Sequence, residues 1–173
     1  TFDGKDDYVK MLHSPSLNIS DDRTLEAWIK PEKAPQHSGI IHKLWTYALY
    51  LDKNKIRAFI SILPSDPDIK KKDYCSITST IIPTDGKTWS HVAMTYSKND
   101  PEHKVRIYIN GKEAEYSKQE MVPAPYTIRK TKSPLLIGSY TEKGHPFKGV
   151  IDEVRISDIV RKDFPTKIPK EIL

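Results

Sequence analysis

The chain has 173 residues, of which 37% are hydrophobic and 29% are charged, and its net charge is +5. This length and composition are typical of one globular domain with a real core, and they exclude a disordered chain. No apolar run approaches the roughly 18 residues that a membrane helix needs, so we expect no membrane insertion. The single cysteine excludes an internal disulfide and a cysteine-based zinc site.

The positive charge does not predict a nucleic-acid partner. The lysines are dispersed, and the densest run, residues 70–72, is flanked by Asp66, Asp68 and Asp73. Such a mixture of charges is typical of a solvated loop. The first ten residues lack the apolar core of a signal peptide, so we expect that such a segment was removed or never present.

Short runs rich in β-branched and aromatic residues follow one another along the chain, separated by proline, glycine, asparagine and aspartate. Each run has the length and composition of a strand. Apart from one turn near residues 14–17, no stretch shows useful helical periodicity. Strands are therefore expected at residues 8–11, 25–30, 39–43, 47–52, 55–62, 75–81, 90–97, 105–109, 135–139 and 149–156.

Two hairpins are indicated within this series. Asn110-Gly111 stands between two alternating runs, which is the strongest short-range signal for a tight hairpin turn. Residues 52–54 mark a second turn between the runs on either side. Many short strands with frequent turns predict an all-β sandwich or barrel. We assign residues 1–160 to one domain and residues 161–173 to a C-terminal tail that packs on the domain or trails from it.

The last predicted strand carries an unexpected feature. In "GVIDEVRISDIVR", Val150, Val154 and Ile156 can alternate toward the core, yet Asp152 and Glu153 stand in the middle of the run. A carboxylate in a buried strand needs a partner, since burial without one is costly.

Several other residues are expected to have structural roles. Trp28 and Trp89 lie on alternating strands and are interpreted as core aromatics. Cys75 lies in another alternating stretch, which favours a buried thiol over a nucleophile. Gly138 and Gly149 indicate close backbone approach or a bulge.

The order of seven short motifs resembles that of a known family. The motifs span Phe2 to about Ile159, and together they resemble laminin-G-like, concanavalin A-like jelly-roll modules related to pentraxins. The resemblance implies a curved sandwich of two antiparallel sheets, one of them with a concave face. The motifs are "FDGKDDYVKM", "RTLEAWIKP", "GIIHK…YALYLD", "WSHVAMTYS", "VRIYINGKEA", "PLLIGSY" and "FKGVIDEVRIS".

The resemblance also implies a structural calcium ion on the convex side, held between the last strand and the first. In this sequence Asp152 matches the last-strand carboxylate, while Asp3 and Gly4 belong to the opening motif. Hard oxygen ligands from separate parts of the chain suit Ca²⁺, which accepts irregular geometry. Two alternatives stay open, because Asp152 can instead form an exposed ion pair with Arg155 or a lysine, or accept hydrogen bonds as a buried acid.

Catalysis is not expected, although some concanavalin A-like relatives are glycosidases. Glycoside hydrolysis needs two suitably spaced carboxylates. The nearest candidates, Glu113 and Glu115, follow the tight Asn110-Gly111 turn and lack the accompanying aspartate and aromatic subsites. The six histidines are scattered, without a metal-binding motif.

We therefore expect a recognition module, and two kinds of ligand stay open. A glycan would stack on aromatic rings outside the core motifs. A surface protein would use the charged loop at residues 64–74, because loops on rigid sandwiches often carry function. The resemblance implies an extracellular or cell-surface location. The candidate ligand-binding residues are Trp45, Tyr47, Tyr74, Tyr126, Tyr140 and His145, with Trp45 favoured because it lies between two predicted strands.

Overall fold

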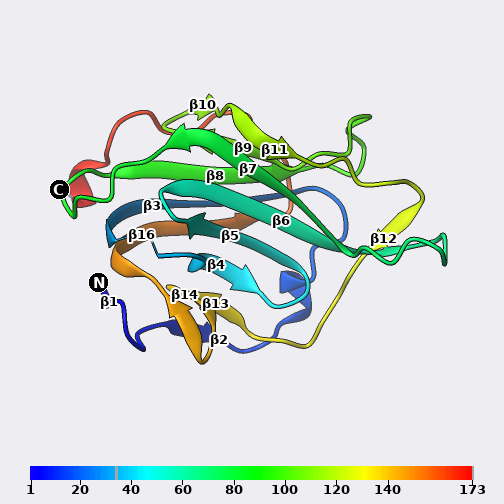
Figure 1. Ribbon diagram of the computed structural model, residues 1–173, viewed down its shortest axis with the longest axis horizontal. Coiled ribbons are helices and arrows are strands. Elements are labelled where there is room, and N and C mark those ends of the chain that lie inside the picture. Colours follow the sequence, from blue (N-terminus) through cyan, green and yellow to red (C-terminus); the bar gives the residue numbers. More distant parts are fainter. Residues whose placement is uncertain (34, 173) are drawn as a thin grey trace.

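The computed structural model describes residues 1–33 and 35–172, and two antiparallel sheets account for most of them. Figure 1 shows the sheets lying one over the other, with both chain ends on the same side of the molecule. The six-stranded sheet has the order β1 (Phe2–Asp3), β16 (Lys148–Ser157), β3 (Arg23–Lys33), β8 (Ser90–Tyr96), β9 (Arg106–Ile109) and β10 (Lys112–Glu113).

The second sheet is larger and has eight strands. Its order is β11 (Tyr116–Gln119), β7 (Asp73–Ile81), β6 (Lys55–Pro64), β5 (Tyr47–Asp52), β4 (Ser38–Lys43), β13 (Leu135–Ile137) and β2 (Val9–Met11), and β12 (Tyr126–Ile128) pairs with β6. A separate hairpin consists of β14 (Ser139–Thr141) and β15 (Gly144–Pro146). Two 3-10 turns, Pro15–Leu17 and Lys170–Ile172, are the helical elements of the described residues, and neither could cross a membrane.

The core lies between the two sheets and follows from the alternation of the strands. Leu49 and Leu51 of β5 point inward and are fully buried, as are Leu25 and Ile29 of β3 on the opposite sheet. Because strand side chains alternate between faces, the residue between Leu49 and Leu51 points outward. The predicted all-β sandwich is therefore confirmed.

Both predicted hairpins are present. Asn110 and Gly111 connect β9 to β10 and have φ angles of 48° and 83°. Two consecutive residues with positive φ are what a tight hairpin turn requires. The other turn joins β5 to β6, where Asp52 pairs with Lys55.

The first and last strands are adjacent, as the resemblance implied, since Phe2 of β1 pairs with Gly149 of β16. Gly149 has a φ of 133°, and a Cβ atom there would lie 2.2 Å from the Lys30 carbonyl oxygen. The expected close backbone approach at Gly149 is confirmed.

A β-bulge explains the acidic residues of the last strand. Asp152 pairs with Trp28 and Arg155 pairs with Glu26, so two residues of β16 lie opposite the single residue between Trp28 and Glu26 on β3. Glu153 has a φ of 49°. Asp152, opposite Trp28, lies on the outer face by ordinary alternation, and the extra residue turns Glu153 outward as well, so both are exposed. The bulge also corrects one predicted core residue of this strand. Ile151, and not Val150, packs against the core together with Val154 and Ile156.

The two tryptophans differ from the prediction of core aromatics. Trp28 is buried but lies outside the core cluster, on the outer face of the six-stranded sheet, with its ring 5.3 Å from that of His91. Trp89 is half-buried beneath the Lys30 ammonium, which lies 4.9 Å from the ring centroid. Cys75 is buried as predicted, and burial raises the pKa of its thiol.

The C-terminal segment crosses the outer face of the six-stranded sheet. Thr24 Oγ1 donates a hydrogen bond of 2.7 Å to the Ile159 carbonyl oxygen. Further along, the Phe164 ring lies 5.8 Å from the His91 ring and 4.7 Å from the Tyr108 ring. These contacts bury Phe164 and hold the segment against the sheet.

Candidate functional site: an aromatic face on the eight-stranded sheet

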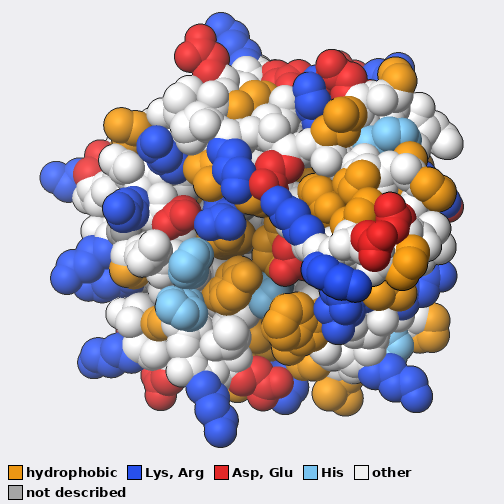
Figure 2. All heavy atoms as spheres, turned by 45° about the vertical axis from the view of Figure 1, so that its right-hand side comes forward, with side chains coloured by type: hydrophobic (Ala, Val, Ile, Leu, Met, Phe, Trp, Pro, Cys, Tyr) orange, Lys and Arg blue, Asp and Glu red, His pale blue; other side chains and the backbone are white. Residues whose placement is uncertain are grey.

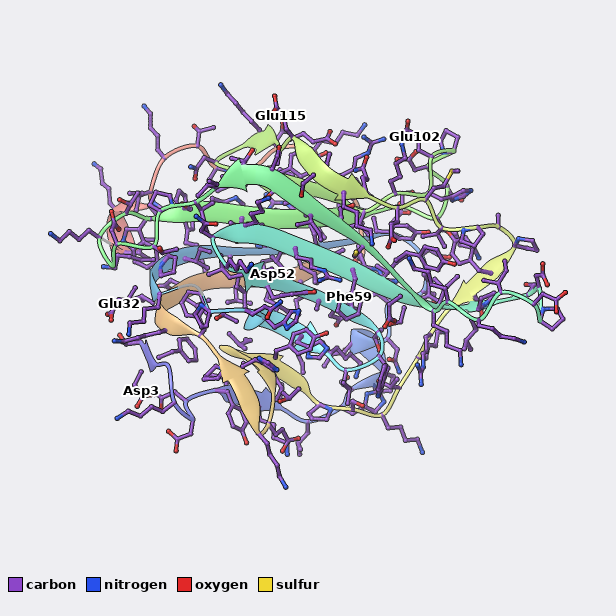
Figure 3. All side chains as sticks on the ribbon, in the orientation of Figure 1. Asp3, Glu32, Asp52, Phe59, Glu102 and Glu115 are labelled. Atoms are coloured by element: carbon purple, nitrogen blue, oxygen red, sulfur yellow. The ribbon has the colours of Figure 1, made fainter. Side chains whose placement is uncertain are left out.

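The outer face of the eight-stranded sheet has a second apolar layer, separate from the core. Its centre contains Ala48, Tyr50, Phe59 and Cys75 from β5, β6 and β7, with Tyr140 packed against them. Figure 3 labels Asp52 and Phe59, which project from β5 and β6 on this face. A large aromatic layer on the outer side of a sheet is informative, because the core does not require it.

Small residues allow the β14–β15 hairpin to lie on this face. A Cβ atom at Gly39 would come within 2.1 Å of the Ser139 carbonyl carbon, so only glycine permits this approach. The hairpin then places the Tyr140 ring flat on the His42 ring, with centroids 4.2 Å apart and an interplanar angle of 10°. The Tyr140 ring also meets that of Tyr50 edge-on at 5.1 Å.

Two further histidines extend the layer toward solvent. The His37 ring lies 5.7 Å from Tyr50 and 5.5 Å from His145. Both histidines have left-handed backbone, with φ angles of 64° and 63°. We name this set the aromatic face, and in Figure 2 histidine and hydrophobic side chains lie together on this side, bordered by lysine and arginine. It consists of His37, His42, Tyr50, Phe59, Tyr140 and His145.

Charged and polar groups border the aromatic face. The Arg57 guanidinium lies 5.7 Å from the Tyr50 ring centroid and donates to Asp52 Oδ2 at 3.4 Å. His42 Nδ1 pairs with the Tyr140 carbonyl oxygen, and burial lowers the pKa of His42 to about 4. His42 is therefore neutral at physiological pH. Burial also raises the pKa values of Tyr50 and Tyr140, so both keep their hydroxyl protons.

The aromatic face therefore offers a ligand two kinds of contact, apolar ring surface and hydrogen-bonding groups. Tyr140 and His37 are half-buried and His145 is exposed, so part of the ring surface can be reached from solvent. Arg57 and the tyrosine hydroxyls offer hydrogen-bond donors and acceptors beside those rings. This combination suits a ligand with apolar faces and polar edges.

The structure brings two of the predicted ligand residues, Tyr140 and His145, onto the aromatic face, with ring centroids 6.1 Å apart. Trp45 lies elsewhere, in the β4–β5 turn, where it is 49% exposed and stacks with Arg129 at 5.1 Å. Its neighbour Leu44 lines an apolar pocket of about 370 Å³ that Tyr140 borders from the other side. Trp45 is thus at the margin of the region and not at its centre.

For three other predicted residues the structure requires a correction. Tyr47, Tyr74 and Tyr126 all belong to the core between the sheets and are at most 7% exposed. The Tyr47 hydroxyl donates to the Leu17 carbonyl oxygen at 3.1 Å. Each follows the inward alternation of its strand, so a ligand cannot reach these rings without opening the core.

The predicted metal ligands do not meet. Asp3 pairs with Lys148, and Asp152 lies four residues further along β16, a separation of about 13 Å at the usual rise of a strand. Asp152 Oδ1 instead accepts the Glu153 backbone N–H at 2.8 Å.

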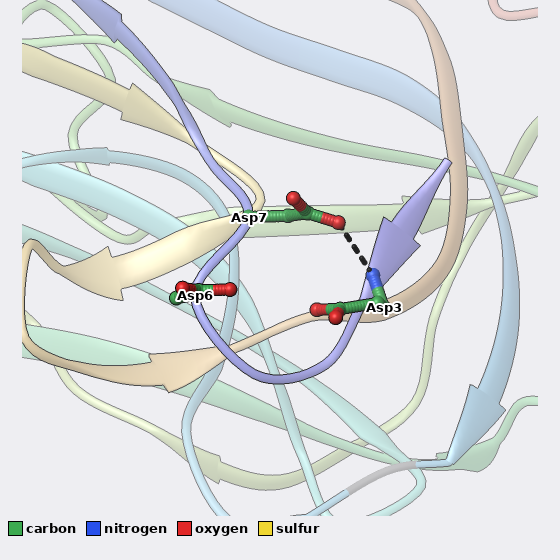
Figure 4. A group of neighbouring side chains, drawn as sticks. All are labelled: Asp3, Asp6 and Asp7. Carbon is green, nitrogen blue, oxygen red and sulfur yellow. Dashed lines mark hydrogen bonds between the residues drawn. The ribbon is translucent and has the colours of Figure 1, made fainter.

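A different set of carboxylates comes together near the N-terminus. Asp3, Asp6 and Asp7 are exposed, and their ligand atoms lie within 4.8 Å of one another. Figure 4 shows the three side chains around the loop that contains Gly4, and the Asp3 N–H donates to Asp7 Oδ2 at 2.9 Å. Three hard oxygen donors on one loop suit a Ca²⁺ ion, which leaves Asp152 outside the set.

The sequence predictions missed four members of the aromatic face: His37, His42, Tyr50 and Phe59. A signal for two of them was available, because Tyr50 and Phe59 alternate with inward Leu49, Leu51 and Ile60 in strands that were predicted. Aromatic residues at the outward positions of two adjacent strands indicate a second apolar layer. The signal for His37 and His42 was weaker, since their neighbours come from a distant hairpin.

Comparisons with known proteins agree with this architecture. The family model described as the concanavalin A-like lectin/glucanases superfamily matches residues 3–163. A search of curated proteins gave no match.

Three solved structures are similar in fold. A candidate carbohydrate-binding protein from Bacteroides ovatus is 18% identical with a TM-score of 0.65, over 92% of this chain and 44% of that one. The CBM40 module of the Ruminococcus gnavus IT-sialidase, bound to α2,3-sialyllactose, is 11% identical with a TM-score of 0.61, over 93% and 92% of the two chains. Domains LG4-5 of the mouse laminin α1 chain are 11% identical with a TM-score of 0.60, over 96% and 44%.

The chain spans less than half of the Bacteroides ovatus and laminin structures and nearly all of the Ruminococcus gnavus module. At these identities the likeness concerns the fold. The family match covers most of the chain and agrees with the two-sheet sandwich described above. The chain therefore belongs to the concanavalin A-like lectin/glucanase superfamily.

Proposed function

We propose that this domain is a non-catalytic recognition module that binds a glycan on the aromatic face. The observation that carries the proposal is the half-buried ring of Tyr140, which stacks on His42 and is bordered by His37 and His145. Sugar rings present C–H groups on their faces and hydroxyls at their edges. Aromatic rings bind the first and side chains such as Arg57 bind the second.

One further observation supports a glycan. The same fold carries sialyllactose in the Ruminococcus gnavus module. A glycan ligand implies that the domain works outside the cell or at its surface.

A glycan array probed with the labelled domain tests the function. We expect saturable binding to a restricted set of glycans, and no release of reducing ends when a bound glycan is incubated with the domain. An array without a saturable signal would contradict glycan recognition, and measurable release of reducing ends would contradict the non-catalytic assignment.

A protein partner is the second candidate, and one observation favours it. Leu12, Leu44 and Trp45 are 80%, 41% and 49% exposed, which is unusual for large apolar side chains. Leu12 follows the last residue of β2, and Leu44 and Trp45 lie in the β4–β5 turn, where Leu44 lines the apolar pocket. Binding of a surface protein that Trp45→Ala weakens, without any effect of free glycans, would favour this alternative.

We also propose that Asp3, Asp6 and Asp7 hold a structural Ca²⁺ ion. An ion that binds only the folded domain stabilises it, by about 2.7 kcal/mol at a hundredfold excess over Kd. The melting temperature should therefore fall with EDTA and recover with calcium, while magnesium, which demands tighter octahedral geometry, should restore less.

Two matched variants locate this ion. Asp7→Asn should abolish the calcium response, because it removes a charge from the cluster. Asp152→Asn should leave the response intact, since Asp152 lies away from the cluster. A melting temperature that is unchanged between EDTA and millimolar calcium would contradict the site.

A further inference from the structure

A second cavity, of about 390 Å³, lies on the outer face of the six-stranded sheet. The aromatic face lies on the other sheet, on the opposite side of the sandwich. Glu26, Trp28 and His91, from β3 and β8, line its floor. Glu153 and Arg155 of β16 line one wall, and the C-terminal segment forms the other. The residues of that segment are Arg161, Asp163, Phe164, Pro165 and Pro169.

Glu26 is the electrostatic centre of the floor. Its side chain is 4% exposed, and its Oε2 lies 3.3 Å from His91 Nε2. Its Oε1 accepts a hydrogen bond from Arg161 and lies 3.6 Å from Arg155 Nη1. Burial alone would raise the pKa of Glu26, but His91 and Arg161 outweigh it and hold the pKa below its ordinary value. The carboxylate is therefore charged and fixed in place.

The contact between Glu26 and Arg161 fastens the C-terminal segment, and it leaves the exposed Arg155 side chain free to bind a ligand. His91 is 2% exposed, and its Nδ1 has no hydrogen-bond partner among the described residues. The Arg155 side chain is 56% exposed, and its only ion-pair contact within the described chain is the one to Glu26. A buried ring nitrogen without a partner is costly unless something satisfies it.

The bulge in β16 is what adds the second wall. Because two residues lie opposite one between Asp152 and Arg155, Glu153 turns outward into the cavity lining beside Arg155. A regular strand would have pointed Glu153 into the core. Bulges often re-aim side chains in this way beside binding sites.

We propose that this cavity is a second binding site, for a neutral polyhydroxylated ligand of the size of one sugar ring. Its lining contains two guanidinium groups and three carboxylates, so donors and acceptors are both available. Each hydroxyl group of a sugar both donates and accepts.

The charges of the lining distinguish this ligand class from an ion. Two cations, Arg155 and Arg161, stand among three anions, Glu26, Glu153 and Asp163, so the lining carries charges of both signs. An anion would meet three carboxylates, and a metal cation would meet two guanidinium groups. A neutral polyol meets neither repulsion, and it can bind both kinds of group by hydrogen bonds.

The test follows the indole N–H resonance of Trp28 in ¹H–¹⁵N spectra of the whole chain, assigned with Trp45→Phe and Trp89→Phe variants. Glucose, galactose, mannose and N-acetylglucosamine are titrated separately, with acetate and glucuronate as anionic probes. We expect a saturable shift of the Trp28 resonance with at least one neutral sugar. Arg155→Ala should raise the Kd of that sugar at least tenfold.

Arg155 suits this test because it is mostly exposed, so its loss leaves the Glu26–Arg161 contact in place. Lys98→Ala removes another exposed cation, paired with Asp21, and should change nothing. Tyr140→Ala should also leave the Trp28 shift intact, so this site and the aromatic face succeed or fail separately. The proposal is overturned if Trp28 responds to no neutral sugar, responds only to the anions, or responds equally in Arg155→Ala.

Discussion

Replacing Gly149 with alanine is expected to lower the free energy of unfolding by at least about 3 kcal/mol, because strained backbone alone costs of order 1–3 kcal/mol. The new Cβ would also lie 2.2 Å from the Lys30 carbonyl oxygen and 2.8 Å from Pro31 Cα, both on the adjoining β3 backbone. Neither backbone atom can move without breaking the β3–β16 pairing. For a domain of this size, the loss corresponds to a fall in melting temperature of roughly 6–12 °C.

Gly144→Ala is the matched control. Gly144 lies in the β14–β15 hairpin, and a Cβ atom there would lie 3.6 Å from Thr141 Oγ1, an ordinary contact. Its substitution should change the free energy of unfolding by no more than about 0.5 kcal/mol. Chemical denaturation of both variants measures the difference, and equal stabilities would show that the β3 and β16 backbones do not approach each other this closely at Gly149.

Replacing Tyr140 with alanine is expected to produce the largest loss of ligand affinity. The substitution removes the ring that stacks on His42 and borders both Tyr50 and His145. If sugar contacts scale like aromatic pairs, the loss is about 1.5 kcal/mol, which corresponds to roughly a tenfold rise in Kd. Isothermal titration with a glycan identified on the array measures it.

Two variants separate a direct effect from a disturbed hairpin. Tyr140→Phe keeps the ring and should retain most of the affinity, whereas His145→Ala removes an exposed ring and should weaken binding without changing stability. Trp45→Ala should have little effect, because Trp45 stacks on Arg129 outside the aromatic face. A larger loss with Trp45→Ala than with Tyr140→Ala would move the site to the β4–β5 turn.

Sequence patterns predicted the sandwich well because strand alternation and turn chemistry are local. The Asn110-Gly111 turn needs two positive φ angles and has them. The bulge at Asp152 and Glu153 was not predictable in the same way, because it depends on the pairing of β16 with β3. The two acids are anomalous in the sequence but not in the structure, since Asp152 lies on the outer face by alternation and the extra residue turns Glu153 to the same side.

The candidate site was predicted only in part for the same reason. Tyr140 and His145 are two of the predicted ligand residues, and both are on the aromatic face. Tyr47 and Tyr74 are predicted ligand residues as well, but they point into the core. Only the direction of each side chain separates the two pairs, and that direction follows from register. The partner that holds Tyr140, His42, lies 98 residues away in the chain.

Chemical-shift mapping of a bound glycan tests the central claim most directly. The uniformly labelled domain is titrated with a glycan from the array, and the amide and side-chain resonances are followed. Binding on the aromatic face predicts that the largest shifts occur at Tyr140, His145, His37 and Tyr50, with smaller ones at Arg57. Shifts concentrated at Leu12, Leu44 and Trp45, with the aromatic face unchanged, would contradict it.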